Sequence, residues 1–209
     1  MTEAPFLLSF GLLGPGKGFE LAIAAMPAVV AAVPTARYVI LGPTHPDLLR
    51  TEGEAYRRSL QDQVRKLGLA ANVELVDRFV GRTELGRWLQ AADIFVTPYP
   101  NLDQTVSGTL SHAMGAGKAV VSTPFAHASE LLAGGRGVLA KPDPAALAAA
   151  FIALLADPVR RAAIGARAHA YSRDMLWPGV GARYQVVAER VTHVQQRVAG
   201  RPILESARA

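Results

Sequence analysis

Short, continuously apolar runs alternate with amphipathic stretches from one end of the chain to the other. Apolar runs that stop at glycine, proline or a polar residue are typical of buried strands, and we expect strands at 6–13, 37–41, 73–76, 93–97, 119–122 and 137–140. Apolar residues at helical spacing predict helices at 18–33, 54–67, 83–92, 107–116, 129–133, 144–156, 158–172 and 178–198.

Continuously apolar strands separated by helices indicate a parallel sheet that is covered on both faces. We therefore expect an α/β fold, a single Rossmann-like doubly wound parallel sheet of about six strands with helices on both faces and further helices at the C-terminal end. A closed barrel is the alternative, but it would need eight strand–helix units. The domain should occupy residues 1–198, with a flexible tail at 199–209.

The composition agrees with a globular protein, because half of the 209 residues are hydrophobic and 19% are charged. The absence of cysteine excludes a disulfide scaffold, a cysteine zinc site and a thiol nucleophile. We see no signal peptide or apolar span and expect a soluble, cytoplasmic protein. The net charge of +5 fits anionic substrates or peripheral contact with lipid head groups. Nucleic acid is not an expected partner, because no recognised nucleic-acid motif accompanies the basic residues.

Ligands of a doubly wound sheet bind beyond the carboxyl ends of its strands, so the loops at those ends form the candidate site. The first such loop is the glycine-rich segment 11–18. Gly14 and Gly16 would let the backbone approach a phosphate closely, and Lys17 would add a mobile positive charge.

Segment 11–18 can be interpreted in three ways besides a purely structural tight turn. A P-loop is disfavoured because Gly18 stands where a Ser or Thr would bind magnesium. A dinucleotide fingerprint is disfavoured because the second strand ends at Leu41-Gly42, without an acidic residue for a ribose. We favour a generic anion-binding turn that uses Lys17.

The loop after the fourth strand, together with the helix that follows it, is the second candidate. Ser107, Gly108 and Thr109 can offer hydroxyl and backbone N–H groups to a diphosphate. His112 lies one turn into the helix, where a ligand contact and a purely structural role both remain open. His127 follows the fifth strand on the same side of the sheet, although a lone histidine is more often structural.

Taken in order, these segments resemble the C-terminal domain of GT-B glycosyltransferases, specifically the large family 4, of group 1 type. Each segment alone is unspecific, but their order is specific, and the resemblance covers the chain from about residue 5 to residue 198. The segments that carry it are 11–18, 72–73, 79–85, 91–98, 113–123, 130–132, 135–139 and Trp177.

The resemblance implies a donor site for a nucleoside-diphosphate sugar of UDP or GDP type, with no cofactor and no metal ion. Lys17 would contact the diphosphate, the backbone of 79–82 would hold the base, and the N-terminus of the helix at 107–116 would face the phosphates. The family arginine that follows the first-turn glycine is replaced here by Leu12. Arg78 or Arg82 would then compensate for the lost charge.

Two glutamates of the family, one near the sugar and one on the ribose, align with Gln104 and His112. These two are the candidate catalytic residues by resemblance, and both can still donate hydrogen bonds to hydroxyl groups. Neither supplies the negative charge that would stabilise a developing oxocarbenium ion. The diphosphate charge would fall mainly on Lys17 and on backbone N–H groups.

The family consists of two-domain enzymes, so this chain would be the donor half of a retaining glycosyltransferase of hexosyltransferase type. We expect it to be inactive without an N-terminal acceptor domain, supplied in cis or in trans. A degenerate, non-catalytic module that binds a nucleotide or a protein is the alternative, because the two aligned carboxylates are lost. A nucleotide-dependent oxidoreductase is disfavoured by the missing acidic residue after the second strand. The sequence leaves the acceptor and the oligomeric state open.

Overall fold

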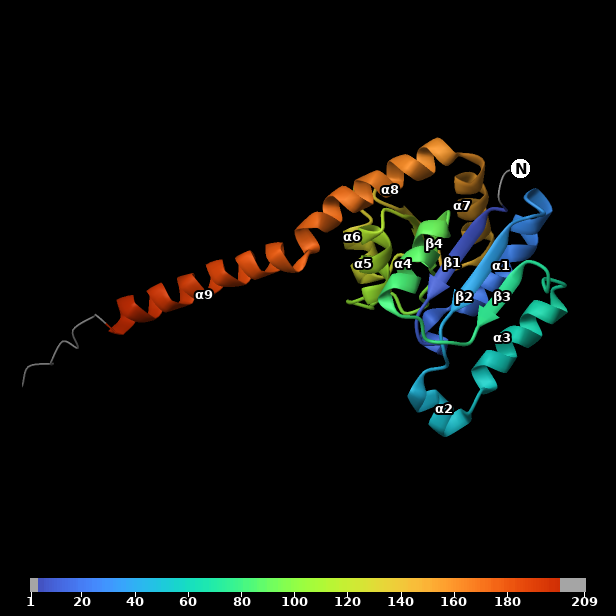
Figure 1. Cartoon of the computed structure of the whole chain (residues 1–209), viewed down its shortest axis with the longest axis horizontal. Helices are drawn as coiled ribbons and strands as arrows, with labels where there is room; N and C mark the ends of the chain where they lie inside the picture. Colours follow the sequence, from blue (N-terminus) through green and yellow to red (C-terminus); the bar gives the residue numbers. More distant parts are fainter. Residues whose placement is uncertain (1–3, 200–209) are drawn as a thin grey trace, which may run out of the picture. The chain divides into compact units, whose positions relative to one another are not determined.

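The computed structural model describes the backbone of residues 4–199 and the side chains of residues 4–191. The strands form one parallel sheet with the order β3-β2-β1-β4-β5-β6. Figure 1 labels the first four of these strands, β3 to β4. This order reverses direction at β1 and β4, as in a Rossmann-like doubly wound sheet, which confirms the predicted fold class. The strands are β1 Phe6–Phe10, β2 Arg37–Leu41, β3 Val73–Val76, β4 Ile94–Thr97, β5 Ala119–Ser122 and β6 Val138–Leu139.

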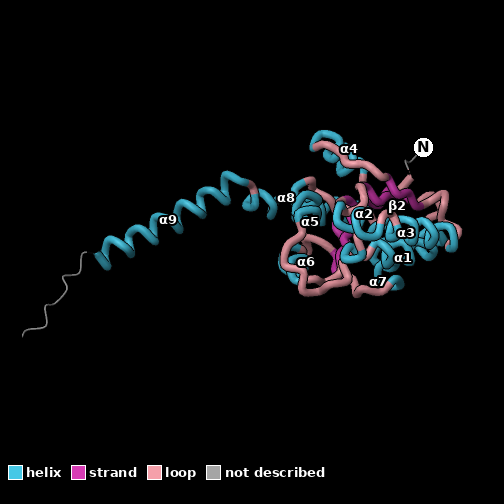
Figure 2. Tube along the Cα trace, turned by 90° about the horizontal axis from the view of Figure 1, so that it is seen from below, coloured by secondary structure: helices cyan, strands magenta, loops and turns pink. Residues whose placement is uncertain are grey.

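Helices cover both faces of the sheet, with α1, α3 and α7 on one side and α4 on the other (Figure 2). The α-helices of the domain are α1 Phe19–Ala32, α2 Pro46–Glu52, α3 Ala55–Lys66, α4 Arg82–Ala91, α5 Gly108–Gly115, α6 Ala126–Leu131, α7 Pro144–Ala156 and α8 Pro158–Ser172. A short 3-10 helix, η1 Pro15–Lys17, precedes α1.

The core depends on strands that are buried on both faces. Leu7 and Leu8 of β1 point to opposite faces, and both are fully buried. On one face the alanine-rich α7 packs against α1, where small residues such as Ala25 and Ala148 allow the two helices to approach closely. Phe151 of α7 fills the space between these helices and the sheet. The alanine-rich segment at 144–156 is therefore a core element of the domain.

The structure differs from the sequence prediction at the end of β1, at the start of α6 and in one additional helix, α2. The first strand ends at Phe10 rather than at 13, because the chain turns at Gly11 and Leu13 forms only an isolated bridge with Thr44. Helix α2 was not among the predicted elements; it is seven residues long and buries none of them, so it carries no apolar periodicity. The helical turn predicted at 129–133 is α6, which begins three residues earlier.

The chain divides into two compact units, residues 1–170 and 171–209. The described part of the second unit contains the 3-10 helix η2, Arg173–Met175, packed against α9, Trp177–Ala199. The tail predicted at 199–209 lies outside the described residues except for Ala199, and the single domain over 1–198 stays a prediction. None of the helices within residues 4–199 combines the length and apolar character needed to cross a bilayer.

Helix α8 lies against the turn between α5 and β5. Gly165 of α8 is buried, and a Cβ atom placed on it would lie 2.1 Å from the carbonyl oxygen of Gly117. His169, one turn further along α8, bonds the carbonyl oxygen of Gly115 through Nδ1 at 2.8 Å. This close backbone approach fixes the C-terminal end of α5, the helix that carries several candidate site residues.

We expect Gly165→Ala to lower the free energy of unfolding by about 1–3 kcal/mol, because the new methyl group overlaps a backbone oxygen that cannot move independently. Gly86→Ala in α4 is the matched control, since a Cβ there would meet no atom within 4 Å. That substitution should leave stability unchanged or raise it by up to about 1 kcal/mol through helix propensity. Urea unfolding followed by circular dichroism measures both. Equal stability of the two variants would contradict the close approach of α8.

Candidate functional site

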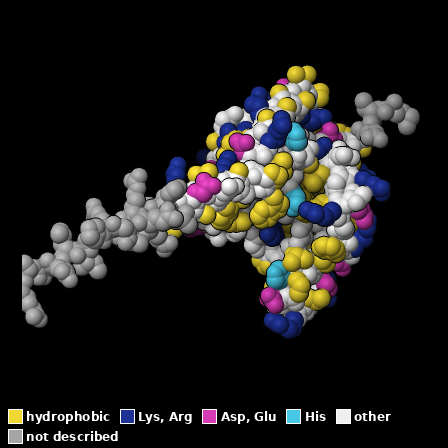
Figure 3. All heavy atoms as spheres, turned by 60° about the vertical axis from the view of Figure 1, so that its left-hand side comes forward, with side chains coloured by type: hydrophobic (Ala, Val, Ile, Leu, Met, Phe, Trp, Pro, Cys, Tyr) yellow, Lys and Arg dark blue, Asp and Glu magenta, His cyan; other side chains and the backbone are white. Residues whose placement is uncertain are grey.

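A cavity of about 430 Å³ opens at the carboxyl ends of β1 and β2, beside the turn that follows β3. Its walls are mainly apolar and include Leu12, Leu41, Phe79 and Leu85. Figure 3 shows hydrophobic side chains gathered on one face, with histidine and basic side chains among them. A cavity of this size and lining fits a flat ring with polar edges.

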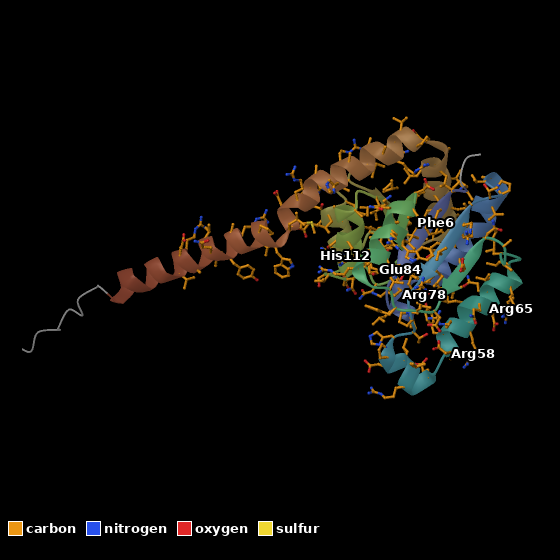
Figure 4. All side chains as sticks on the ribbon, in the orientation of Figure 1. Phe6, Arg58, Arg65, Arg78, Glu84 and His112 are labelled. Atoms are coloured by element: carbon orange, nitrogen blue, oxygen red, sulfur yellow. The ribbon has the colours of Figure 1, made fainter. Side chains whose placement is uncertain are left out.

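Three of the predicted site residues, Arg78, Arg82 and His112, line this cavity. His112 presents its ring to Phe10 in an edge-on arrangement, with 6.2 Å between ring centroids. Arg78 lines the same cavity and is paired with Glu84 (Figure 4). The imidazole is thus available at the cavity wall, where it can hydrogen-bond a hydroxyl group of a ligand.

Glu84 neutralises Arg78 at the mouth of the cavity. The guanidinium donates two hydrogen bonds to the Glu84 carboxylate, one of them at 3.0 Å. These bonds hold the pKa of the Glu84 carboxyl below its usual value. Arg82, an exposed residue at the start of α4, therefore remains as the better candidate to replace the charge that is absent at Leu12.

Lys17, Ser107 and Thr109 do not line the cavity but meet in a second cluster around Tyr99. The Nζ atom of Lys17 donates to the Tyr99 hydroxyl at 3.3 Å and lies 4.6 Å from the centroid of its ring. The same hydroxyl is 3.0 Å from Thr109 Oγ1 and 3.3 Å from Ser107 Oγ. We call these four residues the hydroxyl–lysine cluster.

Sequence reasoning missed Tyr99, the residue at the centre of the hydroxyl–lysine cluster. It is 4% exposed and stacks on Phe125, with ring centroids 4.9 Å apart. Its place in the sequence, two residues after the end of β4, put it at the ligand side of the sheet and could have indicated it.

Gly18 explains how Lys17 reaches this cluster. Its φ angle is +65°, and a Cβ atom there would lie 2.0 Å from the carbonyl oxygen of Pro98. Only glycine permits this approach, which places Lys17 beside the residue that follows Pro98. The glycine that argues against a P-loop is therefore required by the local packing.

Gly14 and Gly16 belong to the 3-10 turn and not to the cavity lining. Gly14 is the residue before η1, and a Cβ there would lie 3.2 Å from a methyl group of Leu48. A Cβ atom on Gly16 would have no other atom within 4 Å. They shape the backbone that carries Lys17 rather than the cavity itself.

The N-terminus of α5 adds polar groups to the hydroxyl–lysine cluster. Ser107 caps the helix by accepting a hydrogen bond from the N–H of Leu110 at 3.3 Å. The N–H groups of Gly108 and Thr109, in the first turn, have no intrahelical partner. A Cβ atom at Gly11 would lie 3.5 Å from Thr109, so the cluster adjoins the cavity lining. An elongated ligand could therefore place a ring in the cavity and an anionic group on α5.

The loop before α5 is held by His127 and directs Gln104 away from the cavity. The Nδ1 atom of His127 accepts a hydrogen bond from the backbone N–H of Ser107 at 2.9 Å, and the backbone N–H of His127 donates to the carbonyl oxygen of Gln104 at 3.1 Å. The Gln104 side chain donates to the carbonyl oxygen of Val106 at 2.7 Å. Of the two residues aligned with family glutamates, His112 lines the cavity and Gln104 does not.

The cavity and cluster contain no set of ligands typical of a metal centre. Within the described part of the chain, no group of three or more His, Asp or Glu side chains is arranged to hold a metal ion. The positive charge of Lys17, the N-terminus of α5 and the exposed Arg82 are features that can meet an anion.

Comparison with known proteins connects this geometry to one family. The family described as "Glycosyl transferases group 1" matches residues 4–157. The chain is 30% identical over 201 residues to a GDP-mannose-dependent monoacylated alpha-(1-6)-phosphatidylinositol monomannoside mannosyltransferase of Corynebacterium glutamicum, covering 92% of this chain and 47% of that protein. It is 30% identical over 195 residues to a phosphatidyl-myo-inositol mannosyltransferase of Mycobacterium tuberculosis, covering 89% and 45%. The chain thus spans about half the length of these curated relatives.

Solved structures share the fold at lower sequence identity. Anabaena Alr3699/HepE in complex with UDP superposes with a TM-score of 0.75 at 21% identity, over 91% of this chain and 49% of that one. Sucrose-phosphate synthase from Thermosynechococcus elongatus superposes with a TM-score of 0.76 at 21% identity, over 92% and 46%. At this identity the likeness establishes the fold, and the site is argued from the residues of this chain.

His127 generates a prediction for the dependence of stability on pH. Burial lowers the pKa of its imidazole below the ordinary value of 6.5, because the charged form is poorly solvated. As the pH falls, the imidazole of His127 therefore binds a proton at a higher pH in the unfolded chain than in the folded protein. The free energy of unfolding should consequently fall as the pH drops below about 6.5. Protonation at Nδ1 would also break the hydrogen bond from Ser107.

In His127→Asn, the amide oxygen can accept the Ser107 hydrogen bond without titrating, so this part of the acid sensitivity should disappear. Urea unfolding between pH 7.5 and 5.0 measures the effect as a difference in slope between the two proteins. Parallel profiles would show that His127 does not contribute.

Proposed function

Because this chain belongs to the group 1 glycosyl transferases, we propose that it forms the donor-binding half of a retaining glycosyltransferase. It would bind a nucleoside-diphosphate sugar and present the sugar for transfer to an acceptor. The observation that carries the proposal is the adjacency of the apolar cavity and the hydroxyl–lysine cluster at the carboxyl edge of the sheet. A base and a diphosphate need these two environments next to one another.

In this proposal the base lies in the cavity, against the backbone of 79–82, and the ribose lies near His112. The diphosphate lies on the hydroxyl–lysine cluster and the N-terminus of α5. The Lys17 ammonium has three N–H donors, of which one is directed at Tyr99, so two can bond phosphate oxygens. Catalysis would come from orienting the donor and from stabilising the negative charge of the departing diphosphate.

Gln104 and His112 take the places of the two family glutamates in this mechanism. His112 would bond a ribose hydroxyl from the cavity wall, and Gln104 would bond a hydroxyl of the transferred sugar. Gln104 must first exchange its hydrogen bond to Val106 for one to the sugar. Neither residue carries a negative charge, so stabilisation of an oxocarbenium-like transition state would depend on the diphosphate itself.

The donor is a UDP- or GDP-sugar in this proposal. The Anabaena protein is in complex with UDP, and the Corynebacterium relative is GDP-mannose-dependent. Both curated relatives have phosphatidylinositol-type acceptors in their names, and a net charge of +5 would draw this chain to an anionic lipid surface. Peripheral membrane contact in the cytoplasm is therefore part of the proposal. No cofactor or metal ion is required by it.

The second half of the enzyme would supply the acceptor site. The chain covers 47% of the Corynebacterium relative and 49% of the Anabaena structure, and both contain a comparable length outside the matched region. We expect this chain alone to bind the donor without transferring sugar, because the acceptor must be held against the donor for reaction.

A non-catalytic nucleotide-binding module is the second candidate function. It is favoured by the cavity lining, which includes no Asp or Glu side chain. Gln104→Glu together with His112→Glu, placed in a full two-domain protein, separates the two functions. A change in sugar turnover supports transfer at this site, whereas nucleotide binding with unchanged, absent turnover supports the module.

We expect saturable binding of UDP or GDP that weakens by at least about tenfold in Lys17→Ala, since a charge-assisted hydrogen bond contributes about 1.5–3 kcal/mol. Isothermal titration calorimetry with UDP, GDP and ADP measures the affinity and identifies the base. Lys66→Ala, which removes an exposed lysine at the end of α3, is the matched control and should bind like the wild type. Equal affinity of both variants would remove Lys17 from the phosphate site.

A further inference from the structure

Arg57 is a buried charge outside the candidate site, and neither the motifs nor the proposed chemistry account for it. It lies on α3, and its side chain is 5% exposed. The buried positions that follow it on the same helix are apolar, Leu60 and Val64. A buried guanidinium costs free energy unless it is paired, and an apolar side chain of similar volume often serves stability equally well. The identity of this residue therefore needs an explanation other than core packing.

The guanidinium of Arg57 joins two loops that line the cavity. Its Nη2 atom donates to the carbonyl oxygen of Gly42 at 2.9 Å and lies 2.8 Å from Oδ1 of Asp77. Gly42 follows β2 and lines the cavity directly. Asp77 follows β3 and immediately precedes the cavity residues 78–82. One nitrogen atom thus fixes the two strand ends between which the base would lie.

A second set of contacts orients the guanidinium. Its Nε atom lies 3.3 Å from Thr44 Oγ1 and 3.3 Å from Glu54 Oε2, and the Thr44 hydroxyl donates to the same carboxylate. The remaining nitrogen, Nη1, is buried and has no hydrogen-bond partner among the described residues. The side chain leaves both N–H groups of Nη1 unsatisfied while it holds both loops, as expected if positioning rather than stability determines the residue.

A displacement of Gly42 would be transmitted to the hydroxyl–lysine cluster. The N–H of Gly42 donates to Val76 O at 2.9 Å, and a Cβ atom on Gly42 would lie 2.1 Å from the carbonyl oxygen of Gly11. Gly11 in turn lies against Thr109. Contacts this close leave no room for independent movement of the three segments.

We infer that Arg57 is a positioning residue for this site: it sets the separation of the loop after β2 from the turn after β3, and thereby the shape of the cavity that would take the nucleoside base. The part of the inference that concerns the ligand rests on the proposed function. The part that concerns the two loops does not.

Arg57→Lys tests this, because lysine keeps the charge but cannot bond Gly42, Asp77 and Thr44 together. Arg58→Lys is the matched control, since Arg58 is the exposed neighbour on the outer side of α3 (Figure 4). Hydrogen–deuterium exchange of the unliganded proteins should show peptides covering 42–45 and 77–82 exchanging at least about fivefold faster in Arg57→Lys, with α7 unchanged. The control should match the wild type throughout.

The affinity for the nucleotide that the wild type binds, measured where each variant is fully folded, gives the second readout. Arg57→Lys should weaken it by about tenfold, and Arg58→Lys should leave it unchanged. A residue that only stabilises the fold would lower the melting temperature without changing the affinity of the folded protein. That result, or exchange that rises uniformly over the domain, would overturn the inference.

Two further outcomes keep the inference separate from the proposed function. If the wild type binds no nucleotide, the proposed function fails, and the exchange pattern alone decides the role of Arg57. If Arg57→Lys does not fold, Asp77→Ala replaces it, because Asp77 is half-exposed and that substitution removes only the link to the turn after β3. Faster exchange confined to 77–82 is then expected, and unchanged exchange there overturns the inference.

Discussion

The contact between the backbones of Gly11 and Gly42 is the constraint on which the candidate site depends. A side chain on Gly42 would overlap the carbonyl oxygen of Gly11, so the chain segments that leave β1 and β2 can lie side by side only without it. This closeness brings the cavity wall at Leu12 next to the turn after β3, and it places Gly11 against Thr109 of α5. The cavity and the hydroxyl–lysine cluster are therefore two ends of one continuous surface, fixed by backbone packing that has little room to adjust.

The charges of the site are distributed according to how deeply they lie. Arg57, which is buried, is bonded to a carbonyl group and faces Glu54 and Asp77, as a buried cation must be. Arg78, at the cavity mouth, is neutralised by Glu84. Lys17 is held instead by a hydroxyl group and an aromatic ring, both neutral. Lys17 can thus accept an anionic ligand without first losing an ion pair, and it lies in the hydroxyl–lysine cluster beside the N-terminus of α5, where the diphosphate is placed in the proposed function.

The residues that depart from the family pattern, Leu12, Gln104 and His112, change the polarity of the cavity and of the loop before α5. Leu12 and His112 both line the cavity, where the family would have an arginine and a glutamate. Losing one charge of each sign leaves the local balance unchanged and makes the cavity more apolar. Gln104 is turned into its own loop, where it bonds Val106. In the proposed function, the cavity would thus still take the base, while the chemistry near the sugar would depend on whether Gln104 can turn outward.

The sequence by itself predicted the parallel sheet, because the central strands β1, β2, β4 and β5 are largely apolar runs that a sheet covered on both faces buries. It also determined which loops lie at the carboxyl edge and that Lys17, Ser107, Thr109 and His112 are there. It could not predict α2, which buries no side chain, nor Tyr99 and Arg57. Lys17 and Tyr99 are 82 positions apart, and Arg57 meets Asp77 across two strand ends. Such contacts leave no periodic pattern in the chain, and only tertiary packing decided which of the edge residues meet one another and which face the cavity.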